Sequence, residues 1–84
     1  MVEEIAEVKI GTKDLLTYIY SIIRNQKVTL LARGTNMKKA IDVGLIAQRN
    51  YDYKINSVKL YDSSYTDENQ KERYVSNIEI ELSK

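Results

Sequence analysis

The sequence predicts an α/β protein of order β-α-β-α-β-β. It is expected to be a two-layer sandwich in which two helices cover one face of a four-stranded mixed sheet, with a long projecting C-terminal hairpin. Three observations lead to this prediction. Apolar and polar residues alternate near both ends of the chain, as in half-buried strands. Two internal segments repeat apolar residues at helical spacing. Because crossovers between parallel strands are right-handed, both helices are expected on one face.

The first strand and helix occupy the first 25 residues. Ala6, Val8 and Ile10 alternate with charged residues, which indicates a strand. Gly11 breaks this pattern, and Thr12 is predicted to be the N-cap of the helix that follows. The helical stripe comprises Leu15, Leu16, Ile19, Ile22 and Ile23, and it ends near Arg24-Asn25. Tyr18 and Tyr20 flank this stripe, and both are expected to lie partly in the core.

The middle of the chain predicts a central strand and a closely packed helix. The segment Val28–Arg33 is almost continuously apolar, which favours a strand covered on at least one face. A turn at residues 34–36 follows. The second helical face contains Met37, Ala40, Ile41, Gly44, Leu45 and Ala47. Its small residues indicate close packing against the sheet or the other helix.

The C-terminal third predicts the hairpin. Tyr53 and Ile55 share a face, but the next apolar positions follow only after a step of three, at Val58 and Leu60, which indicates a β-bulge. A polar stretch lies between two strand patterns, with its turn expected at residues 67–70. In the last strand, Ile78, Ile80 and Leu82 are expected to face inward, and Glu79 and Glu81 outward.

Composition limits the possible functions. The 84 residues form one predicted domain, 1–84, whose small core favours oligomerisation. The chain has no Cys and no His, which excludes disulfides, Cys/His zinc sites and a Ser-His-Asp triad. No cofactor or metal is expected. Apolar runs are too short to cross a membrane, and the acidic N-terminus does not resemble a signal peptide, so a cytoplasmic location is expected.

Cations gather at the two predicted strand-to-helix junctions. Lys13 stands at the first, and Arg33, Lys38 and Lys39 surround the second. A helix N-terminus offers free N–H groups and a positive dipole, which together favour anions such as phosphate. The alternative is a solvated helix face on which Lys38 pairs with Asp42. The net charge of +1 requires any nucleic-acid binding to come from such a local cluster.

The hairpin carries a second group of candidate residues. Lys71 and Arg73 lie near its tip, and Tyr61, Tyr65 and Tyr74 are close in sequence, so the hairpin could enter a groove of nucleic acid. The acidic residues Asp62, Asp67, Glu68 and Glu72 would oppose this, and a merely solvated hairpin is the alternative. Carboxylate pairs such as Glu79 and Glu81 show no sign of a cleft, so no enzymatic activity is expected.

The junction sequences resemble those of a known family. The run Ala32-Arg33-Gly34 followed by Lys39-Ala40-Ile41-Asp42 matches the pattern A-R-G-x-x-x-x-K-A-[VI]-[DE] of the Alba family of small archaeal chromatin proteins. Ile10-Gly11 with a following lysine, Tyr18, and Ser76-x-Ile78-Glu79-Ile80 agree as well. The resemblance covers essentially the whole chain. It departs at Gly11-Thr12-Lys13-Asp14, where the family typically has Gly-Lys-Lys-Pro, so the lysine acetylated in some members is Thr12 here.

The resemblance implies a homodimer that binds double-stranded DNA with little sequence preference, and RNA as well. Lys13, Arg33 and Lys39 would be the body contacts, and Lys38 is basic at a position that the motif leaves free. Lys71 and Arg73 would be contacts of the hairpin arm, and Tyr51 would take part in contacts between dimers on DNA. The predicted role is a chromosome-associated protein that packages DNA. Two alternatives remain open: an RNA-binding protein acting in RNA stability or a ribonucleoprotein, and a protein-interaction module using the cations. No membrane or small-molecule partner is expected.

Overall fold

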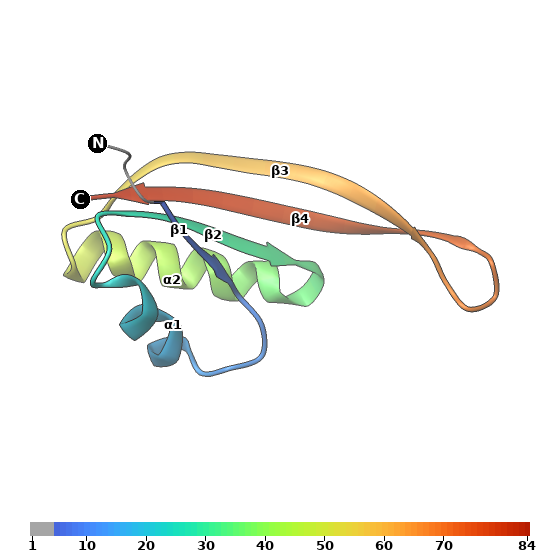
Figure 1. The fold of residues 1–84 in the computed structure, drawn as a ribbon, viewed down its shortest axis with the longest axis horizontal. Helices are drawn as coiled ribbons and strands as arrows, with labels where there is room; N and C mark the ends of the chain where they lie inside the picture. Colours follow the sequence, from blue (N-terminus) through green and yellow to red (C-terminus); the bar gives the residue numbers. More distant parts are fainter. Residues whose placement is uncertain (1–4) are drawn as a thin grey trace.

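A computed structural model describes residues 5–84, and it confirms the predicted order of elements (Figure 1). A short 3-10 helix separates the second strand from the second helix. The elements are β1 Ala6–Lys9, α1 Leu15–Ile22, β2 Lys27–Arg33, η1 Gly34–Asn36, α2 Met37–Asn50, β3 Lys54–Thr66 and β4 Glu72–Ser83.

The four strands form one mixed sheet in the order β1-β2-β4-β3. β1 and β2 are parallel, and the other two pairings are antiparallel. Both helices lie on the same face of the sheet, as right-handed crossovers require (Figure 1). We call the opposite face the open face. Beyond the pair Arg33–Asn77, β3 and β4 pair only with each other, and residues 62–76 project from the body as an arm.

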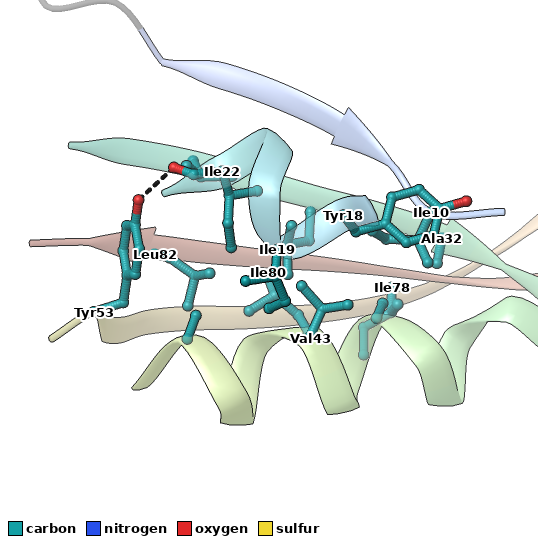
Figure 2. Packing of buried hydrophobic residues seen from close by; sticks show 14 residues of the cluster. Ile10, Tyr18, Ile19, Ile22, Ala32, Val43, Tyr53, Ile78, Ile80 and Leu82 are labelled. Carbon is teal, nitrogen blue, oxygen red and sulfur yellow. Dashed lines mark hydrogen bonds between the residues drawn. The ribbon is translucent and has the colours of Figure 1, made fainter. Parts of the chain in front are cut away.

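The core fills the space between the sheet and the helices (Figure 2). Alternation on β2 and β4 places Val28, Leu30, Ile78, Ile80 and Leu82 on the helix side, in agreement with the predicted inward positions. The helices contribute fully buried Ile19, Ile22, Val43 and Ala47. Burial of one such aliphatic side chain contributes about 1.5–3 kcal/mol, so these few residues supply much of the stability of the chain.

Gly44 marks the place where α2 comes close to the sheet. A Cβ atom added there would lie 3.7 Å from two atoms of Ile80 and 3.9 Å from Leu30. These are ordinary van der Waals distances, so alanine fits, whereas a larger side chain would overlap the core.

We therefore expect Gly44→Ala to stabilise the protein. Alanine is favoured over glycine inside a helix by about 0.8–1 kcal/mol, and the small added contact costs nothing here. Thermal or urea denaturation would measure the change. Gly44→Leu is the matched opposite and should destabilise by about 1–3 kcal/mol through overpacking. If Gly44→Ala destabilised the protein instead, the space between α2 and the sheet would be too small even for a methyl group.

The start of α1 differs from the prediction for Thr12. The N-cap position is Asp14, and its side chain makes no capping hydrogen bond. The loop is held instead by the Tyr18 hydroxyl, which accepts hydrogen bonds from the backbone N–H of Gly11 at 2.7 Å and of Lys13 at 3.2 Å. The prediction of Thr12 as N-cap was wrong. The hydroxyl of this tyrosine, one turn inside the helix, accepts hydrogen bonds from the loop N–H groups in place of a threonine side chain.

The two tyrosines of the first helix differ in burial. Tyr18 is buried, as expected, but Tyr20 is 65% exposed, so the prediction that it lies partly in the core was wrong. In an eight-residue helix only one narrow side reaches the sheet, and Tyr20 faces away from it. Tyr53 holds the other end of α1, because its hydroxyl donates toward the carbonyl oxygen of Ile22 (Figure 2). The carbonyl oxygen of Asn25 is also within hydrogen-bond distance of this hydroxyl.

The predicted β-bulge in β3 is confirmed. Ile55 pairs with Leu82, but Ser57 already pairs with Glu81, so Asn56 is the extra residue. The bulge keeps Val58 and Leu60 on the same side of the sheet as Ile80 and Ile78, their partners on β4.

Candidate nucleic-acid interface

Four cations lie at the edge of the sheet where β1 and β2 end. Because β1 and β2 are parallel, the loop after β1 and the start of α2 meet at this edge. Lys39 joins them directly, since its ammonium donates a hydrogen bond to the backbone carbonyl of Lys13 at 2.7 Å. We call Lys13, Arg33, Lys38 and Lys39 the cationic edge. The sequence predicted that the two junctions converge, and the contact between Lys39 and Lys13 confirms it.

Both helices at this edge begin without a side-chain cap. Neither Asp14 nor Asn36, the N-cap residues of α1 and α2, makes a side-chain capping hydrogen bond. Neither helix has an acidic residue in its first turn. The positive ends of the two helix dipoles therefore lie beside the cations, but the first N–H group of α2, that of Met37, already donates to the carbonyl oxygen of Gly34.

The four cations are not equivalent. The Lys38 ammonium lies 3.5 Å from the Asp42 carboxylate, which is the pair that the solvated-face alternative predicted. Because Lys38 is almost fully exposed, this pair contributes little stability, and water or an anion could replace it. Lys39 is half-buried and is held at the junction. Within residues 5–84, Arg33 has no hydrogen-bond or ion-pair partner, and its side chain is exposed.

Lys71 and Arg73 lie next to the turn at the tip of the arm, and the arm projects away from the body of the protein (Figure 1). The turn lies at residues 67–70, as predicted. Asp67 organises it: one carboxylate oxygen accepts from the N–H of Asn69 at 2.9 Å and of Lys71 at 3.0 Å. The other accepts from Nε of Arg73 at 2.9 Å. Arg73 is thus partly neutralised, whereas the Lys71 side chain is exposed.

These contacts predict a pH dependence at the tip. The hydrogen bond from Arg73, and those from the backbone of Lys71 and Asn69, hold the pKa of Asp67 below its usual value of 3.8. A lowered folded-state pKa means that the contacts persist above the unfolded pKa and are lost as pH falls through the folded one. We expect the amide resonances of Asn69 and Lys71 to titrate together with a midpoint below 3.8. In Asp67→Asn this transition should be absent; a midpoint at or above 3.8 would contradict the contacts.

The open face has a pocket of about 420 Å³ next to the cationic edge. Its lining includes Lys9 of β1, Leu31 and Arg33 of β2, Tyr61 of β3, and Asn77 and Glu79 of β4. Sequence reasoning considered Tyr61 only in relation to the hairpin, and it did not select Lys9 or Asn77. These residues come from four strands, so only the strand order could bring them together.

An apolar strip lies on the helix side of β3. Val58 and Leu60 are 52% and 69% exposed, because α2 packs over β2 and β4 and leaves this edge strand uncovered. Ile41 of α2 is also exposed, and Met37, one turn earlier, lines a shallow hollow together with Leu60. We call Met37, Ile41, Val58 and Leu60 the apolar strip. Its side chains extend the apolar surface of the core to the outside of the molecule along α2 and β3.

Tyr51 lies at the C-terminus of α2. It is half-buried and packs against the core, and its N–H donates to the carbonyl of Ala47 at 3.1 Å. Part of its side chain remains accessible to solvent. Among residues 5–84, no group of acidic side chains is arranged to hold a metal ion. In the same part of the chain, no helix has both the length and the apolar character needed to cross a membrane.

Comparison with known proteins gives consistent relatives, although no family model matches the chain. The DNA/RNA-binding protein Alba of Nitrosopumilus maritimus is 34% identical over 80 residues, which cover 87% of this chain and 84% of that protein. The structure of Alba from Thermoplasma volcanium has a TM-score of 0.79 and 28% identity, and covers 96% of this chain and 100% of that one. ALBA1 of Trypanosoma brucei shares the fold, with a TM-score of 0.71 at 17% identity over 93% of this chain and 68% of its own.

Proposed function

The chain belongs to the Alba family, and from this premise we propose that it is a non-catalytic protein that binds double-stranded DNA with little sequence preference and also binds RNA. The observation that carries this proposal is the cationic edge. It combines Lys13, Arg33 and Lys39 with two helix N-termini whose first turns contain no acidic residue. Such a surface suits phosphate groups, which every sequence presents alike. The name of the relative from Nitrosopumilus maritimus supports both kinds of nucleic acid.

The protein acts as a homodimer in this proposal. Two observations support it. The side chains of Val58, Leu60 and Ile41 in the apolar strip are exposed, and the core of the chain is small for an independent domain. A second copy offers a surface of the same chemistry, and two-fold pairing is the commonest way to cover it. Pairing doubles the cationic edge and places two arms on one assembly. Lys71 would then be the freer arm cation, because Arg73 is paired with Asp67.

Chromosome packaging in the cytoplasm is the cellular role that we propose for this activity. Coating of DNA requires contacts between neighbouring dimers, and the accessible part of Tyr51 supports a role there. An RNA-directed role is the second candidate, supported by the DNA/RNA-binding name of the curated relative.

A binding titration tests the proposal. Fluorescence anisotropy with labelled duplex DNA of two unrelated sequences and with duplex RNA, each at two salt concentrations, should give similar affinities for the two DNA sequences and weaker binding at high salt. A large preference for one DNA sequence would contradict phosphate-based recognition. Absence of binding to every duplex at low salt would reject the proposal and favour a protein partner for the cationic edge.

A further inference from the structure

The open-face pocket has a regular construction that the duplex-binding proposal does not use. Two rows of side chains cross the sheet there. Arg33 pairs with Asn77, and Asn77 pairs with Tyr61, so these three stand side by side on β2, β4 and β3. In the neighbouring row Lys9 pairs with Leu31, which pairs with Glu79. At about 4.8 Å between adjacent strands, each row spans about 10 Å. This width suits one nucleotide.

The two ends of the pocket differ in chemistry. Lys9 and Arg33 supply positive charge, and within residues 5–84 neither has a hydrogen-bond or ion-pair partner. Tyr61 supplies an aromatic ring that is 48% exposed. Its hydroxyl donates to a carboxylate oxygen of Glu79 at 3.2 Å, which ties the ring to its neighbour on β4. Loss of solvent around the hydroxyl, together with the charge of Glu79, raises the pKa of Tyr61, so the ring remains neutral at physiological pH.

The polar groups at the centre of the pocket are acceptors. The amide nitrogen of Asn77 is used inside the protein, because it donates to Ser63 at 2.9 Å, to the Val75 carbonyl at 3.1 Å and to the Tyr61 carbonyl at 3.4 Å. The two amide hydrogens are shared among these three acceptors, which fixes the orientation of the amide and leaves its oxygen free to accept. Glu79 has further acceptor capacity beyond the bond from Tyr61.

We propose that this pocket binds one unpaired nucleotide of a single-stranded nucleic acid, with a preference for bases that carry an amino group. The base stacks on Tyr61, its amino group donates to Asn77 or Glu79, and the adjoining phosphate lies against Lys9 and Arg33. Acidic side chains accept from the cytosine amino group in this way, whereas uracil has no such donor. Stacking on aromatic side chains is the usual source of single-strand affinity. A paired base inside a duplex cannot enter the pocket, so the site is separate from the duplex contacts, with which it shares only Arg33.

The binding of single-stranded probes by Tyr61 variants tests this inference. The probes are labelled ten-nucleotide oligocytidine and oligouridine RNA and a blunt DNA duplex. The wild-type protein should bind oligocytidine more tightly than oligouridine. Tyr61→Ile keeps a strand-forming side chain but removes the ring, and it should weaken oligocytidine binding about tenfold, equivalent to about 1.4 kcal/mol, while duplex binding changes less than about twofold. Tyr61→Phe, which retains the ring, should stay within about threefold of wild type.

Matched variants separate the pocket from general effects. Tyr20→Ile removes another exposed tyrosine, on α1, and should change no affinity. Lys9→Ala should weaken oligocytidine binding, whereas Lys54→Ala, at the far end of β3, should not. An unchanged oligocytidine affinity in folded Tyr61→Ile, or equal binding of the two RNA probes by the wild type, would overturn the inference. An equal loss on the duplex would also overturn it, by assigning Tyr61 to the duplex interface. Because the single-stranded and duplex probes are measured separately, failure of duplex binding alone rejects only the proposed function.

Discussion

Leu60→Asp is expected to convert the proposed dimer into a monomer at micromolar concentration. Leu60 is the most exposed member of the apolar strip, with 69% of its surface accessible in the single chain. In a two-fold dimer the substitution places two carboxylates in one apolar contact. Each unpaired buried charge costs several kcal/mol, so the dissociation constant of the dimer should rise by at least about a hundredfold. Sedimentation equilibrium would measure this change.

Leu16→Asp is the matched control for this prediction. Leu16 is 60% exposed, but it lies on the outer side of α1, away from β3. The same charge introduced there should leave the dimer intact. If Leu16→Asp dissociated the dimer and Leu60→Asp did not, the interface would lie on α1. A wild-type protein that sediments as a monomer at the same concentration would exclude the dimer altogether.

Lys39→Ala should weaken binding to any duplex and reduce its dependence on salt. If Lys13, Arg33 and Lys39 each contact a phosphate, a dimer makes about six contacts, and the slope of log affinity against log salt is about −5. Affinity then falls about a thousandfold between about 50 and 200 mM salt. Loss of two contacts per dimer should make the slope shallower by about 2, with the same loss on unrelated sequences, because phosphates carry no base information.

Two further variants separate charge from structure at this position. The Lys39 ammonium also binds the Lys13 carbonyl, so alanine could act by loosening the loop after β1. Lys39→Arg retains the charge, and it should restore most of the salt slope if phosphate contact is the cause. Lys38→Ala should have a smaller effect, because Lys38 is already paired with Asp42. Unaltered affinity and slope in Lys39→Ala would mean that this lysine serves only to join the two junctions.

Much of the fold could be predicted from the sequence because its signals are local. Alternation at Ile78, Ile80 and Leu82 was enough to place the last strand, and the broken phase between Ile55 and Val58 was enough to predict the bulge. The cap of α1 could not be predicted by the same reasoning. A threonine before a helix usually caps it, but here the Tyr18 hydroxyl reaches back to the loop instead.

The candidate site was predictable only where its residues are close along the chain. The cations around Gly34 are visible in one short motif, and the contact of Lys39 with Lys13 follows from two parallel strands ending together. The roles of these cations in binding remain predictions. The open-face pocket depends on β4 lying between β2 and β3, which no local pattern specifies. Likewise, the pairing of Arg73 with Asp67 depends on how the hairpin turn closes.

The extra residue in β3 affects the course of the hairpin, whereas the side chains of the arm determine its surface charge. A bulge bends and twists its strand, and Asn56 lies near the start of β3, where β4 is still paired with β2, ahead of the arm of residues 62–76. Deletion of Asn56 would leave regular alternation and keep Val58 and Leu60 in phase with β4, yet the arm would leave the body at a different angle. Substitutions farther along the arm would change its charge and leave its course unaltered. The gain or loss of one residue at this position is therefore a way to alter the course of β3 without changing the side chains of the arm.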